Sequence, residues 1–272
     1  MGTTRLARPQ FNWVTNGNST LKNGTGGSPT PPPLTQDADY PMGNLQHADR
    51  HTVWSTGGSA PATILVHYDL GSDRAVKLVG FLGLNRALAT DAFPSTVDVG
   101  SRTAAQGYSA TEGDYATASS VAATNRVDNV AVVNVTARYW QFAFKLVPSS
   151  GFTLGKVVLH SSGLDDLGIA YAPGAERHII RPRAATRTPG GALAATNLGN
   201  NYNAFVLPFR SVTSTELAML QALTLVTEPF IYIDSYADEV WECIARPEFA
   251  RVHRWGPSPN LFDVTLEFEG LQ

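Results

Sequence analysis

The segment HADRH, residues 47 to 51, places three side chains that could ligate a metal at alternate positions: His47, Asp49 and His51. Imidazole and carboxylate groups are the usual protein ligands of divalent cations such as Zn²⁺. A protein site also needs further ligands fixed by a rigid shell, and the sequence holds no second cluster of His, Asp and Glu of comparable density. We therefore expect no metal site in this chain.

Residue patterns for catalysis are equally scarce. The sequence has no Gly-x-Ser-x-Gly elbow, and its one cysteine, Cys243, alternates with Trp241 and Ala245 as a buried, inert strand residue would. The adjacent Asp165 and Asp166 would face opposite ways in a strand, which does not suit paired acid and base work. No glycine pattern follows a strand and opens a helix, as nucleotide binding requires. We expect a protein that is not an enzyme and holds no cofactor.

Sugar recognition is the chemistry that the polar and aromatic loop residues could still perform. Such sites combine an exposed aromatic ring with Arg, Asp, Asn or His side chains on loops at one end of a sandwich. The alternative is a purely architectural role, in which the same loops meet neighbouring protein. The candidates for ligand binding are Asp49, Arg50, His51, Tyr108, Tyr115 and Arg126.

Composition limits the partners of the chain. The 272 residues carry a formal net charge of -3, and charged residues make up 16% of them. Nucleic acid and anionic lipid attract clustered Lys and Arg, and no such cluster is evident, so we expect neither as a partner. The start, MGTTRLARPQFNWV, lacks the apolar stretch of a signal peptide, and no later stretch is long enough to cross a bilayer. We expect a protein made in a cytoplasm, without membrane insertion.

The segment TARYWQFAF, residues 136 to 144, shows how a strand would position side chains. In a strand alternate residues share a face, so Trp140, Phe142 and Phe144, together with Arg138, would point one way. Tyr139, Gln141, Ala143 and Lys145 would point the other way, which makes one face apolar and the other mixed. The residues predicted to lie in a core are Trp54, Trp140, Phe142 and Phe144.

The distribution of such patterns divides the chain into three parts, of which the first two are residues 1–40 and residues 41–160. Residues 1–40 contain a stretch rich in Gly, Ser, Thr, Asn and Pro, and we predict an extended N-terminal arm that lies across a neighbouring subunit or stays a flexible terminus. Residues 41–160 hold short runs rich in Val, Ile and aromatic residues, typical of an antiparallel sandwich or jelly roll. Within them residues 104–125 are small and polar, which predicts a long surface loop.

Residues 161–272 are predicted to form a second β-rich domain with one short helix near 214–225. Thr213 and Glu216 have the spacing of a capping box, and Leu217, Leu220 and Leu223 follow on one helical face. The run FDVTLEFEG alternates apolar and polar residues without a break, which indicates a strand. The predicted fold class is therefore mainly β, with a jelly-roll or β-sandwich domain followed by a second β-rich domain.

Three pieces of residues 40–160 resemble the discoidin-like, or galactose-binding-like, domain family. They are NLQHADRHTVWST at 44–56, ILVHYDLGSDRAVKLVGFLG at 64–83 and ARYWQFAF at 137–144, in the order and spacing of that family. The resemblance implies a jelly-roll fold, which occurs in many carbohydrate-binding modules. It makes a glycan a possible partner of the predicted loops.

The second half has a weaker resemblance to minor or distal tail proteins of long-tailed bacteriophages. It rests on VLPFRSVTSTELAMLQAL, FIYIDSYADEVWECIARPEF and LFDVTLEFEG taken together. The resemblance implies a structural component of a tail tip or baseplate that is located in the virion. Such a component would form a ring-like homo-oligomer and would assemble with other phage tail proteins. Our leading hypothesis is this structural role. The alternative hypothesis is a carbohydrate-binding module that contributes to attachment at the host surface.

Overall fold

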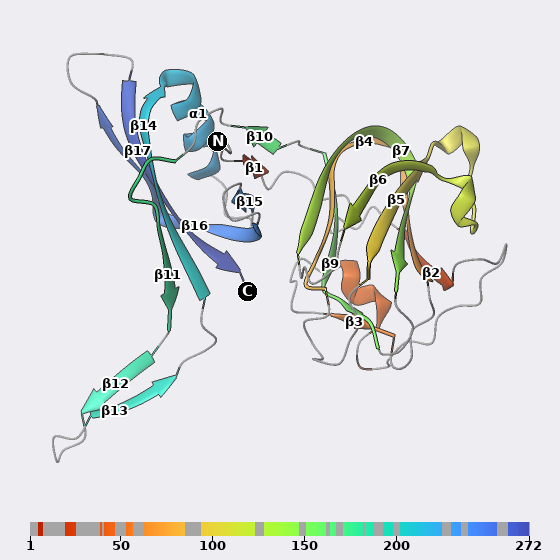
Figure 1. Cartoon of the computed structure of the whole chain (residues 1–272), viewed down its shortest axis with the longest axis horizontal. Helices are drawn as coiled ribbons and strands as arrows, with labels where there is room; N and C mark the ends of the chain where they lie inside the picture. The colour runs from red at the N-terminus through yellow and green to blue at the C-terminus, as the bar shows by residue number, and fades with distance from the viewer. Residues whose placement is uncertain are drawn as a thin grey trace. The chain divides into compact units, whose positions relative to one another are not determined.

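The chain forms two compact units (Figure 1). The N-terminal unit spans Gln10–Leu164, and the C-terminal unit combines Met1–Pro9 with Asp165–Gln272. The structure is a computed structural model that describes residues 5–7, 20–25, 39, 41–46, 53–56, 63–84, 94–122, 128–146, 151–161, 164–166, 171–181, 183–187, 193–197, 202–224, 230–234, 239–254 and 261–271.

The N-terminal unit is built on a six-stranded antiparallel sheet in the order β2-β4-β7-β5-β6, with β9 paired to the second half of β4. Two long strands, β4 (Thr63–Leu82) and β7 (Asn129–Lys145), form its centre because their runs of β-branched and aromatic residues suit a pleated, buried surface. The other strands of this sheet are β2 (Thr20–Thr25), β5 (Thr96–Arg102), β6 (Ala116–Ala122) and β9 (Lys156–His160).

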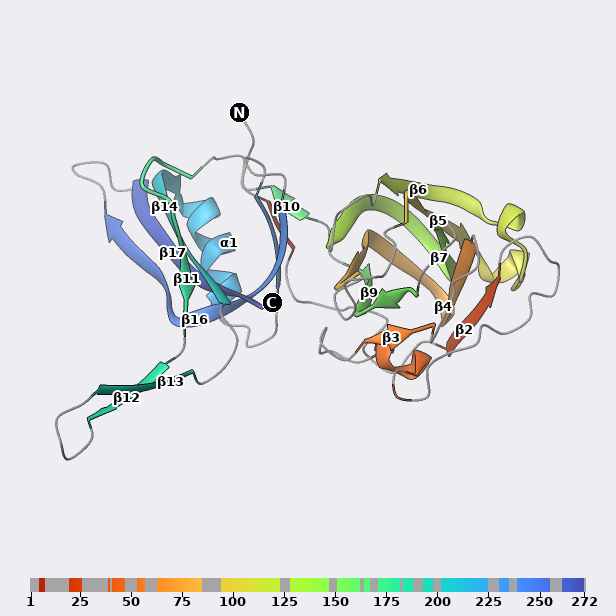
Figure 2. The same ribbon diagram turned by 60° about the horizontal axis from the view of Figure 1, so that its bottom comes forward.

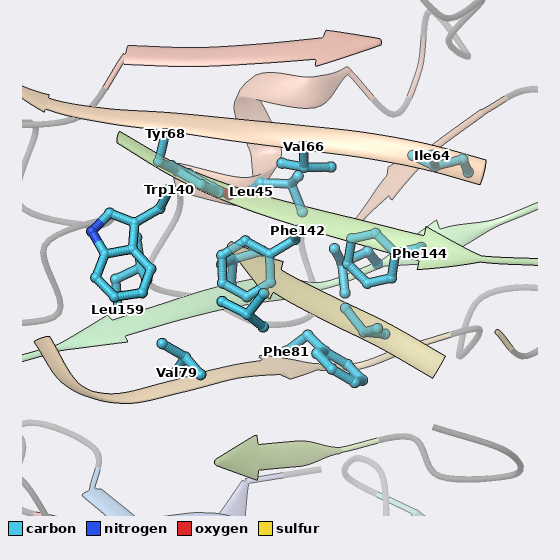
Figure 3. Close-up of a cluster of buried hydrophobic side chains, with 14 of the residues drawn as sticks. Leu45, Ile64, Val66, Tyr68, Val79, Phe81, Trp140, Phe142, Phe144 and Leu159 are labelled. Atoms are coloured by element: carbon cyan, nitrogen blue, oxygen red, sulfur yellow. The ribbon is translucent and has the colours of Figure 1, made fainter. Parts of the chain in front are cut away.

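A smaller layer closes the core of this unit. Strand β3 (Trp54–Ser55) pairs with β8 (Thr153–Leu154), and the 3₁₀ turn η1 (Met42–Gln46) adds Leu45. Trp54, Leu154 and Leu45 belong to the same buried cluster as the apolar face of the sheet. Figure 3 shows Trp140, Phe142 and Phe144 side by side within this cluster. The four residues predicted to lie in the core are 0% exposed: Trp54, Trp140, Phe142 and Phe144.

One segment of this unit differs from the prediction. Residues 104–125, expected as a long surface loop, contain two 3₁₀ turns, η2 (Ala104–Gln106) and η3 (Glu112–Asp114), followed by strand β6. Strand β6 pairs with β5 from Ala116 to Ala122 at the edge of the sheet. Its small residues give no hydrophobic alternation, so the strand depends on ladder hydrogen bonds that the composition does not signal.

The C-terminal unit contains a seven-stranded sheet in the order β10-β1-β15-β16-β17-β14-β11, antiparallel at each step from β1 to β11. Its core gathers aromatic and aliphatic side chains of β14, β15 and β17, including Phe205, Tyr232 and Phe268. Cys243 is buried in the same cluster, as its alternation predicts. The strands are β1 (Arg5–Ala7), β10 (Leu164–Asp166), β11 (Glu176–Ile180), β14 (Tyr202–Thr213), β15 (Phe230–Asp234), β16 (Glu239–Arg254) and β17 (Leu261–Leu271).

Helix α1 (Ser214–Thr224) follows β14 directly and adds Leu220 to the core. The predicted capping box is present. The backbone N–H and hydroxyl of Thr213 donate to Glu216 Oε2 at 2.7 and 2.8 Å, and the Glu216 N–H donates to Thr213 Oγ1 at 3.3 Å. These bonds satisfy donors at the start of the helix that have no partner within it.

A hairpin continues from the free edge of this sheet (Figure 2). Strands β12 (Arg183–Arg187) and β13 (Leu193–Asn197) pair with each other in a two-stranded sheet of their own, beyond the pairing of β11 with β14. At the other end of the chain, the predicted N-terminal arm contributes β1 to the C-terminal unit and β2 to the N-terminal unit.

The predicted fold class is confirmed: the described part of the chain is mainly β, with antiparallel sheets and one short α-helix. Within that part, no helix has the length and apolar character needed to span a membrane.

Candidate functional site

Three residues from three strands lie in one row on the face of the N-terminal sheet that points away from the apolar core. His67 of β4 is directly opposite Gln141 of β7, which is opposite Gly100 of β5. The side-chain nitrogen of Gln141 lies 2.8 Å from His67 Nε2. Which of the two groups donates depends on the tautomer of the imidazole. Both side chains are 2% exposed, so this polar contact is buried.

The loop between β5 and β6 covers this row. Tyr115 lies over Gly100, where an added Cβ atom would come within 2.6 Å of the Tyr115 Cβ, so only glycine leaves room for the tyrosine. The Tyr115 hydroxyl donates to the carbonyl of Ser109 at 2.8 Å, and its ring centre lies 5.7 Å from that of His67. Tyr115 was predicted to face a ligand, but it is only 7% exposed and supports the loop instead.

Tyr108, the second predicted tyrosine, is the residue of this cluster that reaches solvent. It is 41% exposed. Its ring makes edge contacts with His67 at 5.6 Å and 71° and with Tyr139 at 6.0 Å and 65° between centroids and planes. Such T-shaped pairs are favourable because the positive edge of one ring meets the negative face of the other. Partial burial raises the pKa of Tyr108, so the phenol is neutral at physiological pH.

A second row, two positions along each strand, consists of Asp69, Tyr139 and Arg102. Arg138 Nε and Nη2 donate to the two carboxylate oxygens of Asp69 at 2.7 and 3.0 Å. The guanidinium carbon of Arg138 also lies 4.8 Å from the centre of the Tyr139 ring. The hydrogen bond to Asp69 raises the pKa of Arg138. Both members of the ion pair are partly exposed, with side chains 31% and 26% accessible for Arg138 and Asp69.

The contact between Arg138 and Tyr139 departs from the predicted alternation, which grouped Arg138 with Trp140. The pairing of β4 with β7 shifts between Asp69 and Arg74, so Arg138 lies opposite an irregular stretch of β4. A bulge of this kind bends the strand and re-aims side chains. The break in register therefore explains why Arg138 reaches Asp69 and Tyr139.

The covering loop is tied to the sheet at both ends. At its start, Asp73 of β4 accepts a hydrogen bond from the Ala104 N–H at 2.8 Å, and Arg102 Nη2 donates to the Gln106 carbonyl at 2.7 Å. At its end, Lys145 forms an ion pair with Glu112. These contacts fasten the loop that carries Tyr108 to the sheet at separate points.

The arrangement offers an exposed aromatic ring flanked by charged hydrogen-bonding groups. Arg102 lies 5.7 Å from the Tyr115 ring and 3.4 Å from Asp114, so a second ion pair borders the same loop. An aromatic face accepts the apolar side of a ring-shaped ligand, while guanidinium and carboxylate groups exchange hydrogen bonds with its hydroxyls. These are the contacts that a polar cyclic ligand needs.

The other predicted site residues lie outside the described part of the chain: Asp49, Arg50, His51 and Arg126. So does the alternating motif with His47. Among the described residues, no group of three His, Cys, Asp or Glu side chains is placed to hold a metal ion. The sequence reading missed His67, Asp69, Arg102 and Arg138, and the only signal for this region was the mixed face of β7 that carries Tyr139 and Gln141.

The chain matches no protein-family model and no curated protein. Among solved structures it is similar to a GH29 fucosidase of Ruminococcus gnavus in complex with fucose, with 16% identity, 58% of this chain covered and a TM-score of 0.44. The match covers 28% of the fucosidase chain.

Two shorter proteins are also similar. A chitosan-binding module from a chitosanase/glucanase of Paenibacillus sp. IK-5 is 15% identical, with 55% of this chain and 98% of the module covered and a TM-score of 0.40. The lectin domain of lectinolysin, complexed with Lewis B antigen, is 14% identical, with 57% and 99% covered and a TM-score of 0.39. None of the three is described as a tail protein, and likenesses this weak carry no conclusion about what this chain does.

Proposed function

We propose that the N-terminal unit binds carbohydrate, with the exposed ring of Tyr108 as the contact surface. The observation that supports this proposal is that neighbouring aromatic rings fix the orientation of the Tyr108 ring. Tyr108 is 41% exposed although it makes edge contacts with two aromatic side chains, His67 and Tyr139. An exposed ring that is already fixed loses little side-chain entropy when a ligand stacks on it, which favours binding.

The groups around Tyr108 give this surface its polarity. The Asp69–Arg138 and Arg102–Asp114 pairs are joined in the free protein, so their hydrogen-bonding atoms are oriented before a ligand arrives. A sugar presents an apolar C–H face and a rim of hydroxyls, and the site offers a matching aromatic face and a polar rim. Opposite charges are present in each pair, so we propose a ligand without a large net charge.

We propose binding without bond cleavage. Glycoside hydrolysis needs two carboxyl groups that flank the scissile bond, one of which gives a proton. The carboxylates of this site, Asp69 and Asp114, are each paired with an arginine. That arrangement suits hydrogen-bond acceptance rather than proton transfer.

A glycan array probed with the full chain tests the proposal. We expect binding to a subset of neutral glycans and loss of that binding in Tyr108→Ala. Tyr108→Phe keeps the aromatic ring and should retain most of the signal, which separates stacking from hydroxyl hydrogen bonding. A chain that binds no glycan on a broad array of neutral, amino and acidic sugars would contradict the proposal.

A structural role in a bacteriophage tail tip is a second proposal, and the two roles are compatible. The feature that favours it is the hairpin of β12 and β13, which pairs with no other described strand and could engage a neighbouring protein. On this proposal the protein is located in the virion, and the sugar would belong to the host surface. A gene neighbourhood without tape-measure or other tail genes would speak against it.

A further inference from the structure

Two ion pairs lie at opposite ends of one row of the N-terminal sheet. Asp69 of β4 and Arg102 of β5 are both directly opposite Tyr139 of β7, the strand between them. Asp69 is paired with Arg138, and Arg102 is paired with Asp114. Because neighbouring strands of a sheet are about 4.8 Å apart, the backbones at the two ends of this row are about 10 Å apart.

Tyr108 is connected to both ion pairs. Its ring makes an edge contact with Tyr139, the middle residue of the row, at 6.0 Å between ring centres. The guanidinium of Arg138 lies 4.8 Å from the centre of the same Tyr139 ring. The residue after Tyr108, Ser109, donates a hydrogen bond from its hydroxyl to the carboxylate of Asp114. The exposed tyrosine is therefore joined to one ion pair through Tyr139 and to the other through Ser109.

Within the described part of the chain, each ion pair keeps one polar atom that makes no contact. Arg138 contacts Asp69 through Nε and Nη2, which leaves Nη1 as a donor, and its side chain is 31% exposed. Asp114 makes both of its side-chain contacts through Oδ2, which leaves Oδ1 as an acceptor, and its side chain is 52% exposed. One end of the row thus offers a hydrogen-bond donor, and the other end offers an acceptor.

We infer that the site takes an oligosaccharide of two or more sugar units, which lies across β4, β7 and β5. The inference rests on the proposed sugar binding and names the class of its ligand. A single pyranose ring on Tyr108 is shorter than the row, so it reaches Arg138 or Asp114 but not both. Two linked sugars span the row, and their hydroxyls accept from Arg138 Nη1 and donate to Asp114 Oδ1.

The two end groups are oriented before a glycan arrives. Arg138 is fixed by both carboxylate oxygens of Asp69, and Asp114 is fixed by Arg102 and Ser109. A group that is already oriented loses little side-chain entropy when it forms a further hydrogen bond. A second sugar unit that reaches the far end of the row should therefore strengthen binding, and affinity should rise with the length of the glycan.

NMR titration of the full chain with glycans of increasing length tests this inference, because it also measures weak affinities. The probes are glucose, galactose, mannose and N-acetylglucosamine, each as the monosaccharide and as its linear disaccharide and trisaccharide. In at least one series we expect the trisaccharide to bind at least about tenfold more tightly than the monosaccharide. Asp114→Ala should remove most of that gain and leave the monosaccharide affinity nearly unchanged, because a single sugar still stacks on Tyr108 and reaches Arg138.

The comparison of glycan lengths separates a contact made by Asp114 from a role in folding. A misplaced loop would weaken the binding of monosaccharide and trisaccharide equally, and that result would overturn the inference. Glu176→Ala is the matched control, because it removes an exposed, paired carboxylate from the other unit and should change neither affinity.

The probes also separate failure of this inference from failure of the proposed function. Monosaccharides that bind as tightly as trisaccharides in every series would overturn the inference and leave sugar binding standing. A chain that binds none of the probes would contradict both.

Discussion

Asp69 and Arg138 are 69 positions apart in the chain and are joined by two parallel hydrogen bonds of 2.7 and 3.0 Å. The same guanidinium lies over the ring of Tyr139, and that ring meets the edge of Tyr108. The guanidinium of Arg138 thus joins Asp69, at the irregular stretch of β4, to Tyr139, which in turn contacts the exposed Tyr108. The orientation of Tyr108 depends on long-range contacts as well as on its own loop.

Replacing Arg138 with Lys tests this link. Lysine keeps the charge but loses the planar fork and its contact with the ring of Tyr139. We expect glycan binding to weaken by a factor on the order of five, the size of a cation–π contact at a partly exposed site. Arg210→Lys is the matched control, because Arg210 pairs with Asp263 in the other unit. Equal glycan affinities for both variants in calorimetry would exclude the proposed role of Arg138.

Gly100 sets the position of the loop, and Gly100→Ala should disturb it. The new methyl group would lie 2.6 Å from the Tyr115 Cβ, so the tyrosine and the loop must move. We expect a loss of about 1–3 kcal/mol in the unfolding free energy, the usual cost of overpacking, together with weaker glycan binding. Gly113→Ala is the control, since nothing lies within 4 Å of its added methyl group. Thermal unfolding of both variants gives the comparison, and similar melting curves would show that Gly100 is not needed for the fit.

Alkaline pH should destabilise the N-terminal unit through its buried tyrosines. Burial raises the pKa of Tyr68 well above its ordinary value of 10.0, and burial also raises the pKa of Tyr115. Between about pH 10 and the raised pKa, the unfolded chain loses these protons while the folded chain keeps them. Stability is therefore full below pH 10 and falls above it, by about 1.4 kcal/mol per pH unit for each tyrosine.

The variant Tyr68→Phe isolates this effect. The Tyr68 hydroxyl is buried and has no hydrogen-bond partner among the residues that the structure describes, so phenylalanine should cost little or nothing at pH 7. Urea unfolding of the variant from pH 8 to 11 should show a shallower loss of stability than the unaltered chain. Identical pH profiles would mean that Tyr68 ionises normally in the folded protein.

The sequence predicts the features of this fold that depend on residues close together in the chain, and it does not predict those that depend on residues far apart. The alternation along β7 predicts the burial of Trp140 and Phe142, and the capping box predicts the start of α1, because both depend on residues a few positions apart. His67 and Gln141 are 74 positions apart, and only the pairing of β4 with β7 brings them together. No sequence pattern announces such a pairing.

Exposure of the two tyrosines of the candidate site could not be predicted from the sequence either. Tyr108 and Tyr115 were both predicted as ligand-facing because they lie on a polar loop. The room that Gly100 leaves for Tyr115 buries one of them, and this difference arises from a strand that the loop covers. Chain composition points to the loop, but only packing distinguishes the exposed ring of Tyr108 from the buried ring of Tyr115.

Trp140→Ala tests the core of the N-terminal unit. Trp140 is fully buried, so its removal leaves a large cavity, and we expect a loss of about 3–5 kcal/mol in unfolding free energy. Val132→Ala on the same strand changes a residue that is 59% exposed and should stay within about 0.5 kcal/mol of the unaltered chain. Denaturant unfolding must resolve the transition of this unit, because two units can unfold separately. A small effect at Trp140 would mean that the core of the sheet is misassigned.

The most direct test of sugar binding is calorimetry with the glycan that the array identifies, comparing the full chain with Tyr108→Ala and Ile179→Ala. Both variants remove an exposed apolar side chain, but Ile179 belongs to the other unit. We predict that Tyr108→Ala raises the dissociation constant by about tenfold or more, equivalent to about 1.4 kcal/mol, while Ile179→Ala leaves it unchanged. An unchanged dissociation constant for Tyr108→Ala would contradict the assignment of Tyr108 as the sugar-binding surface.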